Sequence, residues 1–148
     1  MTEFAVRLAE PGDARDLLAM IVEHAIFERS NAVISGNDLM RFISGDVSTV
    51  IIYVAVDGQS LLGYAALTTE FSLWRGHFRT HLDCLFVRDG KRSKGIGAAL
   101  LNRAKEHSRT IGLDRLEWQT PDWNTRATSF YEREGATGHP KIRFGLDL

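Results

Sequence analysis

The stretch from His81 to Leu101, HLDCLFVRDGKRSKGIGAALL, constrains the fold of this chain more than any other part of the sequence. It begins with a run of mostly apolar residues, which is typical of a buried strand. It ends with Ile96 and Leu100 at helical spacing. A basic loop and the glycines Gly95 and Gly97 lie between the two parts. The stretch therefore predicts a strand that leads through a tight turn into a helix.

The remaining sequence supplies further strands and helices at short intervals. Alternating or β-branched apolar runs predict strands, and apolar residues at helical spacing predict helices. The strands are expected at residues 4–8, 48–56, 61–69, 81–87, 115–120 and 142–146, and the helices at 14–25, 38–44, 96–111 and 124–134. The order β-α-α-β-β-β-α-β-α-β predicts a mixed α/β (α+β) sheet with helices packed on it. We expect residues 1–148 to form a single domain.

Composition excludes several classes of protein. Hydrophobic residues make up 44% and charged residues 25%, as in an ordinary globular domain, and the formal charge of −1 argues against nucleic-acid binding. No apolar run is long enough to span a membrane, and the N-terminus lacks the pattern of a signal peptide. The single Cys84 cannot form an internal disulfide, which suits a reducing compartment. We therefore expect a cytoplasmic protein with no membrane or nucleic-acid partner.

The glycine turn has the chemistry of an anion site. The first N–H groups of a helix lack internal partners and favour negative charge, and glycine lets a phosphate approach the backbone. Arg92 and Lys94 add positive charge beside these amides. Two familiar nucleotide motifs do not fit, because Gly97 is followed by Ala98 rather than Lys, and Leu100 stands near the place of a third glycine. From this segment alone, an exposed basic helix start remains the alternative.

A second motif lies one predicted strand further along, in DWNTRATSFYEREGA, residues 122–136. Together, R-x-x-G-x-G and W-N-x-x-A-x-x-F-Y-x-x-x-G-A resemble the GNAT superfamily of acetyl-CoA-dependent N-acetyltransferases. The resemblance covers almost the whole chain and extends to the diamine (spermidine/spermine) and thialysine acetyltransferase branch. It implies a GNAT-type, mostly antiparallel central sheet with helices on both faces. It also implies a homodimer, because members of this branch commonly pair.

The resemblance implies how acetyl-CoA would be held. The strand before the glycine turn would pair with the pantetheine arm, and the turn would hold the pyrophosphate. Asn124 would meet the cofactor on its other side, a role compatible with capping a helix. The implied cofactor-binding residues are Leu85, Phe86, Val87, Arg92, Ser93, Lys94, Gly95, Ile96, Gly97, Ala98, Asn124 and Ala127.

Two residues stand at catalytic positions of the resemblance. Tyr131 occupies the place of the general acid, which would protonate the departing CoA thiolate. Asp83 occupies the place of an acidic residue that faces the substrate amine, and period two puts His81 and Leu85 on its face of the strand. A core aromatic is the alternative for Tyr131, and a structural ion pair with an arginine is the alternative for Asp83.

The substrate side is less fully matched. Phe27 and Glu28 fall in the branch's substrate-contact region, as do Glu117, Trp118 and Gln119 on the following strand. Glu28 has an equal alternative as a solvated surface charge. Cys84 replaces a second acid expected after Asp83, and His77, Arg79 and His81 precede it on the same strand. These departures favour a small amine or lysine-like amino acid over a long polyamine.

Other chemistry is disfavoured by the sequence. Cys84 has no triad-like partners and is best interpreted as a core residue rather than an acetylated nucleophile. His77 and His81 lie on a predicted strand without further ligands, so no metal is expected. The leading hypothesis is direct acetyl transfer from acetyl-CoA to a small-molecule amine in a ternary complex. The alternatives are a protein N-terminal or aminoglycoside-type acetyltransferase and a non-catalytic acetyl-CoA sensor.

Overall fold

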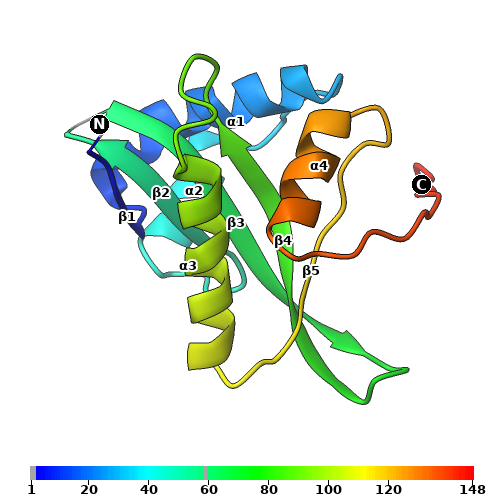
Figure 1. The fold of residues 1–148 in the computed structure, drawn as a ribbon. Coiled ribbons are helices and arrows are strands. Elements are labelled where there is room, and N and C mark those ends of the chain that lie inside the picture. Colours follow the sequence, from blue (N-terminus) through cyan, green and yellow to red (C-terminus); the bar gives the residue numbers. More distant parts are fainter. Residues whose placement is uncertain (1–2, 59) are drawn as a thin grey trace.

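The computed structural model describes residues 3–58 and 60–148, and its centre is a five-stranded sheet (Figure 1). The strands follow one another across the sheet in chain order. They are β1 (Ala5–Leu8), β2 (Ile51–Asp57), β3 (Ser60–Ser72), β4 (His77–Val87) and β5 (Leu116–Glu117). Neighbouring strands run antiparallel, except that β5 is parallel to β4. The expected mostly antiparallel mixed sheet is confirmed.

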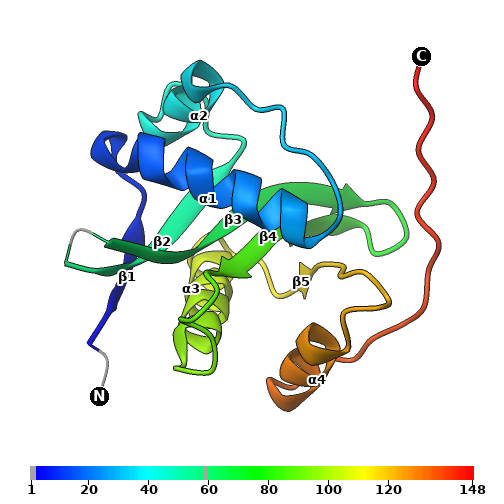
Figure 2. The ribbon, with the colours of Figure 1, turned by 90° about the horizontal axis from the view of Figure 1, so that it is seen from above.

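Helices cover both faces of this sheet, as expected (Figure 2). A short 3₁₀ turn at Pro11–Asp13 leads into α1 (Ala14–Phe27), which lies on one face with α2 (Gly36–Ile43). The other face carries α3 (Ile96–Thr110), and α4 (Thr125–Arg133) lies beyond it next to β5. No helix within residues 3–58 and 60–148 is long and apolar enough to cross a membrane.

Two hydrophobic cores result from this layering. The first joins α1 and α2 to the sheet and includes Leu17, Leu39 and Tyr64. The second joins α3 to the opposite face and includes Leu82 and Leu100, with Phe130 and Tyr131 of α4 packed against it. The strands between them are buried on both sides, which explains their nearly continuous apolar runs. Close packing on both faces fixes the positions of β3 and β4.

A β-bulge interrupts β4 at Asp83. Ala66 of β3 pairs with Cys84, whereas the next residue, Leu67, pairs with Leu82, so Asp83 has no residue opposite it. Beyond the bulge the faces change: Leu82 belongs to the second core, Cys84 packs against the first, and Leu85 faces the second again. The period-two prediction that Asp83 and Leu85 share a face is therefore wrong, although His81 does lie beside Asp83.

A glycine on β3 permits a close approach at the end of β4. Gly63 lies opposite Val87, and a Cβ atom on it would come within 2.6 Å of the carbonyl oxygen of Phe86. No larger residue fits there without moving the backbone. The close approach brings the last residues of β4 against β3 just before the glycine turn begins.

β4 and β5 stay together only briefly. Their pairing covers Thr80 opposite Leu116 and His81 opposite Glu117, while β4 continues to Val87. The strand expected at residues 115–120 is thus confirmed only at its centre. Because β5 departs after two pairs, the second half of β4 has an open edge toward α4.

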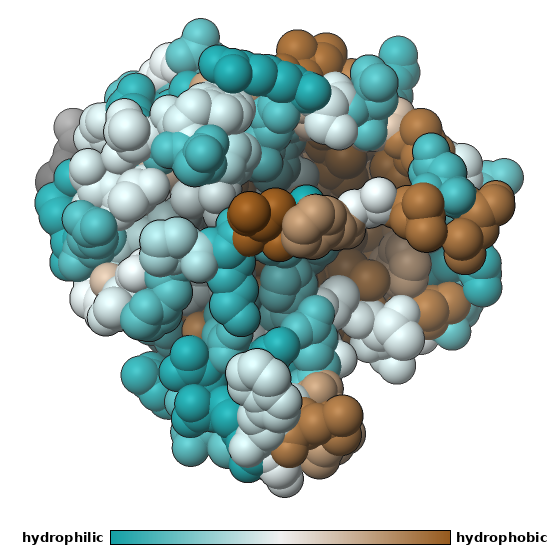
Figure 3. All heavy atoms as spheres, turned by 90° about the vertical axis from the view of Figure 1, so that its right-hand side faces the viewer, coloured by the Kyte–Doolittle hydropathy of each residue, from teal (hydrophilic) through white to brown (hydrophobic). Residues whose placement is uncertain are grey.

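The strand expected at residues 142–146 is not formed. After α4 the chain has no regular structure, and its last segment runs away from the body of the molecule (Figures 1 and 2). Ile142, Phe144 and Leu146 are 80%, 88% and 85% exposed, and apolar residues stand at the surface on the side of the molecule that carries this segment (Figure 3). The alternation of apolar residues reflects a local preference for extended structure, but among residues 3–58 and 60–148 this segment pairs with no strand.

Candidate active site

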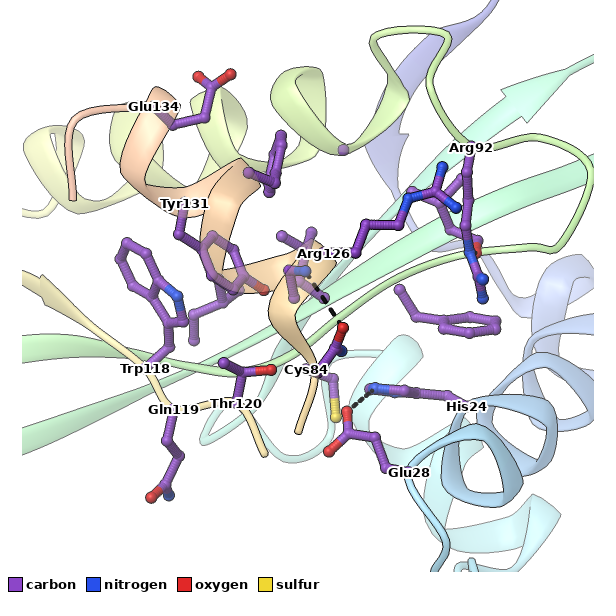
Figure 4. Close-up of a pocket in the computed structure, with 18 of the residues that line it drawn as sticks. His24, Glu28, Cys84, Arg92, Trp118, Gln119, Thr120, Arg126, Tyr131 and Glu134 are labelled. Carbon is purple, nitrogen blue, oxygen red and sulfur yellow. Dashed lines mark hydrogen bonds and ion pairs between the residues drawn. The ribbon is translucent and has the colours of Figure 1, made fainter. Parts of the chain in front are cut away.

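The open edge of β4 forms one wall of a cavity of about 570 Å³. Its other walls come from the end of α1, the glycine turn before α3, the segment after β5, and α4. These elements are far apart in the sequence, and Figure 4 shows their side chains converging. The cavity thus lies where the strand–turn–helix motif meets the second motif.

Most of the predicted site residues line this cavity. The lining includes Phe27, Glu28, Asp83, Leu85, Phe86, Val87, Arg92, Ser93, Gly95, Gly97, Ala98, Trp118, Gln119, Asn124, Ala127 and Tyr131. Three predicted residues are absent from it: Lys94, Ile96 and Glu117. The Ile96 side chain is buried in the second core, and Glu117 is ion-paired with Arg79 and Arg115. Figure 4 shows Gln119 pointing away from the centre of the group.

The glycine turn has a strained backbone and an uncapped helix start. Ser93 and Gly95 have φ values of 62° and 83°, in the left-handed region that residues other than glycine rarely adopt. Gly95 is the N-cap of α3 and has no side chain to accept a bond from the first-turn amides. Gly97 lets α4 pack close to the start of α3, because a Cβ atom added to it would lie 3.4 Å from the Phe130 ring. The turn therefore leaves the first-turn N–H groups of α3 without a side-chain cap, which is the arrangement of an anion site.

Arg92 ties this turn to two walls of the cavity. Its Nε donates to the carbonyl oxygen of Val87 at 3.0 Å, at the end of β4. Its guanidinium lies over the Phe27 ring of α1, 4.6 Å from the centroid, and 5.6 Å from that of Phe86. Both contacts leave the terminal nitrogens of Arg92 available to an anion.

The start of α4 faces the turn from the other side. Asn124 is the N-cap, and its side-chain oxygen accepts from the backbone N–H of Ala127 at 3.2 Å, so the predicted capping role is confirmed. Arg126, which sequence reasoning missed, donates to the Ser93 hydroxyl at 2.8 Å and lines the cavity. The sequence indicated it only through the position of this arginine in the first turn of α4, beside the cap Asn124.

Tyr131 enters the cavity from α4. Its ring packs edge-on against Trp118, with centroids 5.1 Å apart, and also contacts Phe130. Burial raises the pKa of Tyr131 to about 12, with a smaller contribution from the negative charge of Glu28. Tyr131 thus packs against the second core and also lines the cavity. Its hydroxyl stays protonated near neutral pH.

Asp83 lies at a more open place. Its side chain is 60% exposed, and its nearest cation is His81, with Nε2 3.7 Å from Oδ1. The expected alternative of an ion pair with an arginine is not found among residues 3–58 and 60–148. The bulge turns both Asp83 and Cys84 toward the α1 side, and burial raises the pKa of the Cys84 thiol to about 12. A thiol that stays protonated is a poor nucleophile.

The end of α1 contributes residues that the sequence showed only in part. Phe27 and Glu28 were predicted, whereas His24, one turn earlier, was missed. His24 is buried and contacts both Tyr64 and Glu28. An i, i+4 pair of His and Glu on one helix was the signal in the sequence. Trp123, also missed, contacts Phe27 and lies under the guanidinium of Arg29.

The charges around the cavity are more basic than the sequence suggested. Four arginines line it, namely Arg92, Arg126, Arg133 and Arg143, against the carboxylates of Glu28, Asp83 and Glu134. Of the three cations expected on the Asp83 face, only His81 reaches the cavity, because Arg79 pairs with Glu70 and Glu117. Within the described residues, no group of His, Cys, Asp and Glu side chains is placed to hold a metal ion.

The sequence profile of the acetyltransferase (GNAT) family matches residues 19–136, which span the cavity and both motifs. This chain belongs to the GNAT family. Its members take an acetyl group from acetyl-CoA, so the chain is an N-acetyltransferase of this family. The uncapped turn, its glycines and the neighbouring Arg92 and Arg126 fit that donor's phosphates.

Individual relatives agree with this assignment. A thialysine N-epsilon-acetyltransferase of Caenorhabditis elegans is 30% identical over 134 residues, covering 89% of this chain and 82% of the relative. The Bos taurus enzyme of the same name is 25% identical over 88% of this chain and 82% of its own length. Among solved structures, an integron cassette protein from the mobile metagenome of V. cholerae is 25% identical, with a TM-score of 0.77, covering 100% of this chain and 94% of that one.

Proposed function

We propose that this GNAT protein transfers the acetyl group of acetyl-CoA directly to a primary amine of a small molecule, in a ternary complex of both substrates. The observation that carries the proposal is the shared cavity: the glycine turn, Tyr131 and the carboxylates of Glu28 and Asp83 all line it. A donor site, an acid and an amine-binding carboxylate within one cavity are the parts that direct transfer needs. The thialysine acetyltransferases of C. elegans and Bos taurus support the substrate class.

The donor would bind between the turn and α4. Acetyl-CoA supplies an acetyl group activated as a thioester. The first-turn amides of α3, together with Arg92 and Arg126, would hold its phosphates by charge-assisted hydrogen bonds. Leu85, Phe86 and Val87 would offer backbone groups along the open edge of β4, and Asn124 and Ala127 would close the other side.

Tyr131 would act as the general acid. Expulsion of a thiolate is easier when a donor protonates the sulfur, and the protonated phenol of Tyr131 can donate. Trp118 and Phe130 hold the ring, so the hydroxyl is presented in one orientation. On the acceptor side, Asp83 would attract the ammonium form of the amine from solvent, because its carboxylate is exposed at the cavity.

The acceptor is best described as a small amine that also carries a carboxylate. With Arg92 and Arg126 assigned to the donor phosphates, Arg133 and Arg143 remain on the cavity lining for a carboxylate of the acceptor, which suits an amino acid better than a polycation. Lysine, thialysine and ornithine-like molecules have this chemistry, and a polyamine such as spermidine lacks the carboxylate.

The test is an acetyl-CoA-dependent thiol-release screen over amines, amino acids, polyamines and peptides. We expect the highest kcat/KM on lysine-like amino acids, confirmed by mass spectrometry of the acetylated product. A clear preference for spermidine or for peptides would reject the substrate class. Binding of acetyl-CoA without turnover on any acceptor would instead indicate a non-catalytic sensor.

We further propose that the protein is a homodimer. Its last segment alternates apolar residues, Ile142, Phe144 and Leu146, that are almost fully exposed in the single chain. An alternating segment of this kind gains stability when it pairs as a strand and buries one face. A second copy of the chain offers such an edge. The unpaired Cys84 also supports a reducing, cytoplasmic location, which stays a prediction.

A further inference from the structure

His24 joins two residues of different elements inside the cavity wall. Its Nδ1 lies 2.7 Å from the hydroxyl oxygen of Tyr64 on β3, and its Nε2 lies 2.6 Å from Oε2 of Glu28, one turn along α1. Figure 4 shows this ion pair or hydrogen bond as a dashed line between His24 and Glu28. The three side chains form a continuous chain of hydrogen bonds from the core to the cavity.

The direction of the bond to Glu28 follows from its chemistry. An ionised carboxylate only accepts hydrogen bonds, so the proton lies on Nε2 and His24 donates. Among residues 3–58 and 60–148, no hydrogen bond or ion pair is made to the other carboxylate oxygen, Oε1. One oxygen of Glu28 is therefore held, and the other is left for a ligand.

The imidazole that holds Glu28 is itself fixed. His24 is 9% exposed and stacks on Phe86, with ring centroids 4.8 Å apart and an interplanar angle of 19°. Tyr64, which binds its other nitrogen, is 1% exposed. Neither ring has room to turn away, so the position of the Glu28 carboxylate is set by buried groups rather than by its own flexible side chain.

The two carboxylates of the site are therefore not equivalent. Glu28 is anchored at 2.6 Å by a buried donor, whereas Asp83 is largely exposed and has two longer contacts, with His81 Nε2 at 3.7 Å and with the Cys84 thiol at 3.7 Å. The two carboxylates also differ in their effect on Tyr131. The charge of Glu28 contributes to the raised pKa of the Tyr131 hydroxyl, and that of Asp83 does not. Figure 4 shows Tyr131 and Glu28 on opposite sides of the group that contains Cys84 and Thr120.

We propose that His24 is a positioning residue of the acetyl transfer: by linking the Tyr64 hydroxyl to Glu28, it fixes Glu28 as the carboxylate that receives the proton of the acceptor amine. The inference rests on the proposed function and gives the two carboxylates different tasks: Asp83 attracts the amine, and Glu28 deprotonates it. The ammonium N–H bond breaks, its electron pair stays on nitrogen for attack, and the proton goes to Oε1 of Glu28, from which solvent at the cavity mouth removes it. The C–N bond then forms, the C–S bond breaks, and the departing thiolate takes the proton of Tyr131. The nitrogen loses its second proton to solvent and Tyr131 regains one from solvent, so the products are the amide, the CoA thiol and one proton.

The groups that face Glu28 come from four elements. They are His24 on its own helix, Tyr64 on β3, Asp83 and Cys84 on β4, and Tyr131 on α4. Burial raises the pKa of Tyr64, Cys84 and Tyr131, so these three groups stay neutral through the ordinary pH range. The other carboxylate in this group is that of Asp83, whose negative charge acts on Tyr64 and Cys84 together with that of Glu28.

The experiment compares kcat/KM for an accepted amine between pH 6.5 and 9.5 in four variants. We expect Glu28→Gln to lower kcat/KM about 100-fold at pH 7, within the usual range for loss of a general base. Below the pKa of the amine its neutral fraction rises tenfold per pH unit, so the defect shrinks by about tenfold per unit. His24→Phe keeps the stacked ring and loses both nitrogens. It should show the same pH-dependent defect at about a tenth of the size.

Two variants separate positioning from a structural role. His24→Gln places an amide nitrogen near the site of Nε2, and we expect it to recover kcat/KM to within about threefold of wild type. Asp83→Asn should raise KM for the amine and leave the shape of the pH profile unchanged. If His24→Phe does not fold because Tyr64 loses its partner, the double variant Tyr64→Phe/His24→Phe carries the same measurement.

A readout independent of turnover accompanies the kinetics. Long-range ¹H–¹⁵N spectra of protein labelled in its five histidines should show His24 protonated at Nε2, with that proton shifted or lost in Glu28→Gln. A pH-independent loss in Glu28→Gln, or an unchanged rate in His24→Phe, would overturn this inference alone. Absence of acetyl transfer by the wild-type protein to every amine tested would reject the proposed function itself, and this inference with it.

Discussion

The guanidinium of Arg92 lies over the ring of Phe27, with its central carbon 4.6 Å from the ring centroid. This contact joins the glycine turn, where the phosphates of the donor would bind, to the end of α1, where the acceptor would bind. The aromatic face holds the planar cation while the hydrogen bond to Val87 fixes its near end. The donor and acceptor halves of the cavity therefore share one side chain.

Replacing Arg92 by alanine should weaken donor binding. Removal of a charge-assisted hydrogen bond to a phosphate costs about 1.5–3 kcal/mol, so we expect KM for acetyl-CoA to rise at least about tenfold. The KM for the amine should rise less, through the loosened Phe27 ring. Steady-state kinetics in both substrates measure the two effects. Arg41→Ala on α2, an exposed arginine far from the cavity, is the matched control and should change neither constant.

Replacing Tyr131 by phenylalanine should slow the reaction without disturbing binding. Loss of a general acid typically costs about 10²–10⁴-fold in rate, and we expect kcat to fall about 10²-fold or more. The Kd for CoA, measured by calorimetry, should stay within about twofold because the packing against Trp118 is kept. Tyr53→Phe, which removes a hydroxyl from the same core but outside the cavity lining, is the control. An unchanged kcat in Tyr131→Phe would remove this residue from the mechanism.

The raised pKa of Tyr131 also predicts the alkaline side of the pH profile. Burial raises this pKa to about 12, so the phenol is protonated at every lower pH, and its loss as a donor begins only as pH approaches that value. We expect kcat to show no descending limb up to about pH 10.5, whereas an ordinary tyrosine would titrate near pH 10. A descending limb centred at pH 9 to 10 that disappears in Tyr131→Phe would contradict the assignment of this pKa.

Two glycines near the site should respond differently to alanine. In Gly63→Ala the new Cβ would lie 2.6 Å from the Phe86 carbonyl oxygen, and overpacking of this kind costs about 1–3 kcal/mol of unfolding free energy. In Gly97→Ala the Cβ would lie 3.4 Å from the Phe130 ring, an ordinary contact, so the stability should change by less than about 1 kcal/mol. Urea denaturation of both variants measures the difference. Equal stabilities would show that the end of β4 relaxes more easily than its packing indicates.

The C-terminal segment should decide the oligomeric state. Ile142→Asp combined with Phe144→Asp replaces two exposed apolar side chains by charges that would oppose burial in a partner. We expect light scattering to give a dimer for the wild type and a monomer for this double variant. Lys141→Asp changes the charge of the same segment without touching its apolar face and should remain a dimer. A monomeric wild type would reject the proposed homodimer.

Much of the fold was predictable from the sequence because its signals are local. Residues near in sequence specify three of the elements: the β-branched run at 48–56 favours a strand, Gly95 begins α3, and the side chain of Asn124 caps α4. The final strand at 142–146 was wrong for the opposite reason. Alternation shows that a segment can form a strand, but pairing depends on an edge that only the tertiary or quaternary structure supplies.

The candidate site was predictable where a motif fixes spacing and not where tertiary contacts decide. The residues of both motifs meet in one cavity, and the role of Asn124 as a cap followed from its position. His24 escaped notice because its partner Tyr64 is forty residues away, and the i, i+4 spacing to Glu28 does not by itself show that the imidazole is buried. The bulge at Asp83 also leaves no clear mark in the sequence, since one unpaired residue in an apolar strand resembles regular pairing.

That unpaired residue has a consequence for how this sequence tolerates insertion and deletion. Removing Asp83 would leave the cross-strand pairs of β4 unchanged, because Leu82 and Cys84 already lie opposite neighbouring residues of β3. Leu85 and Val87 would still face α3, and the Phe86 ring would stay on His24. Deleting a paired residue such as Leu85 would instead move each following residue by one register position and exchange the two faces of the strand end next to the glycine turn. Variation in length is therefore expected in the loops of this chain and at Asp83, and not at the paired residues between Cys84 and Val87.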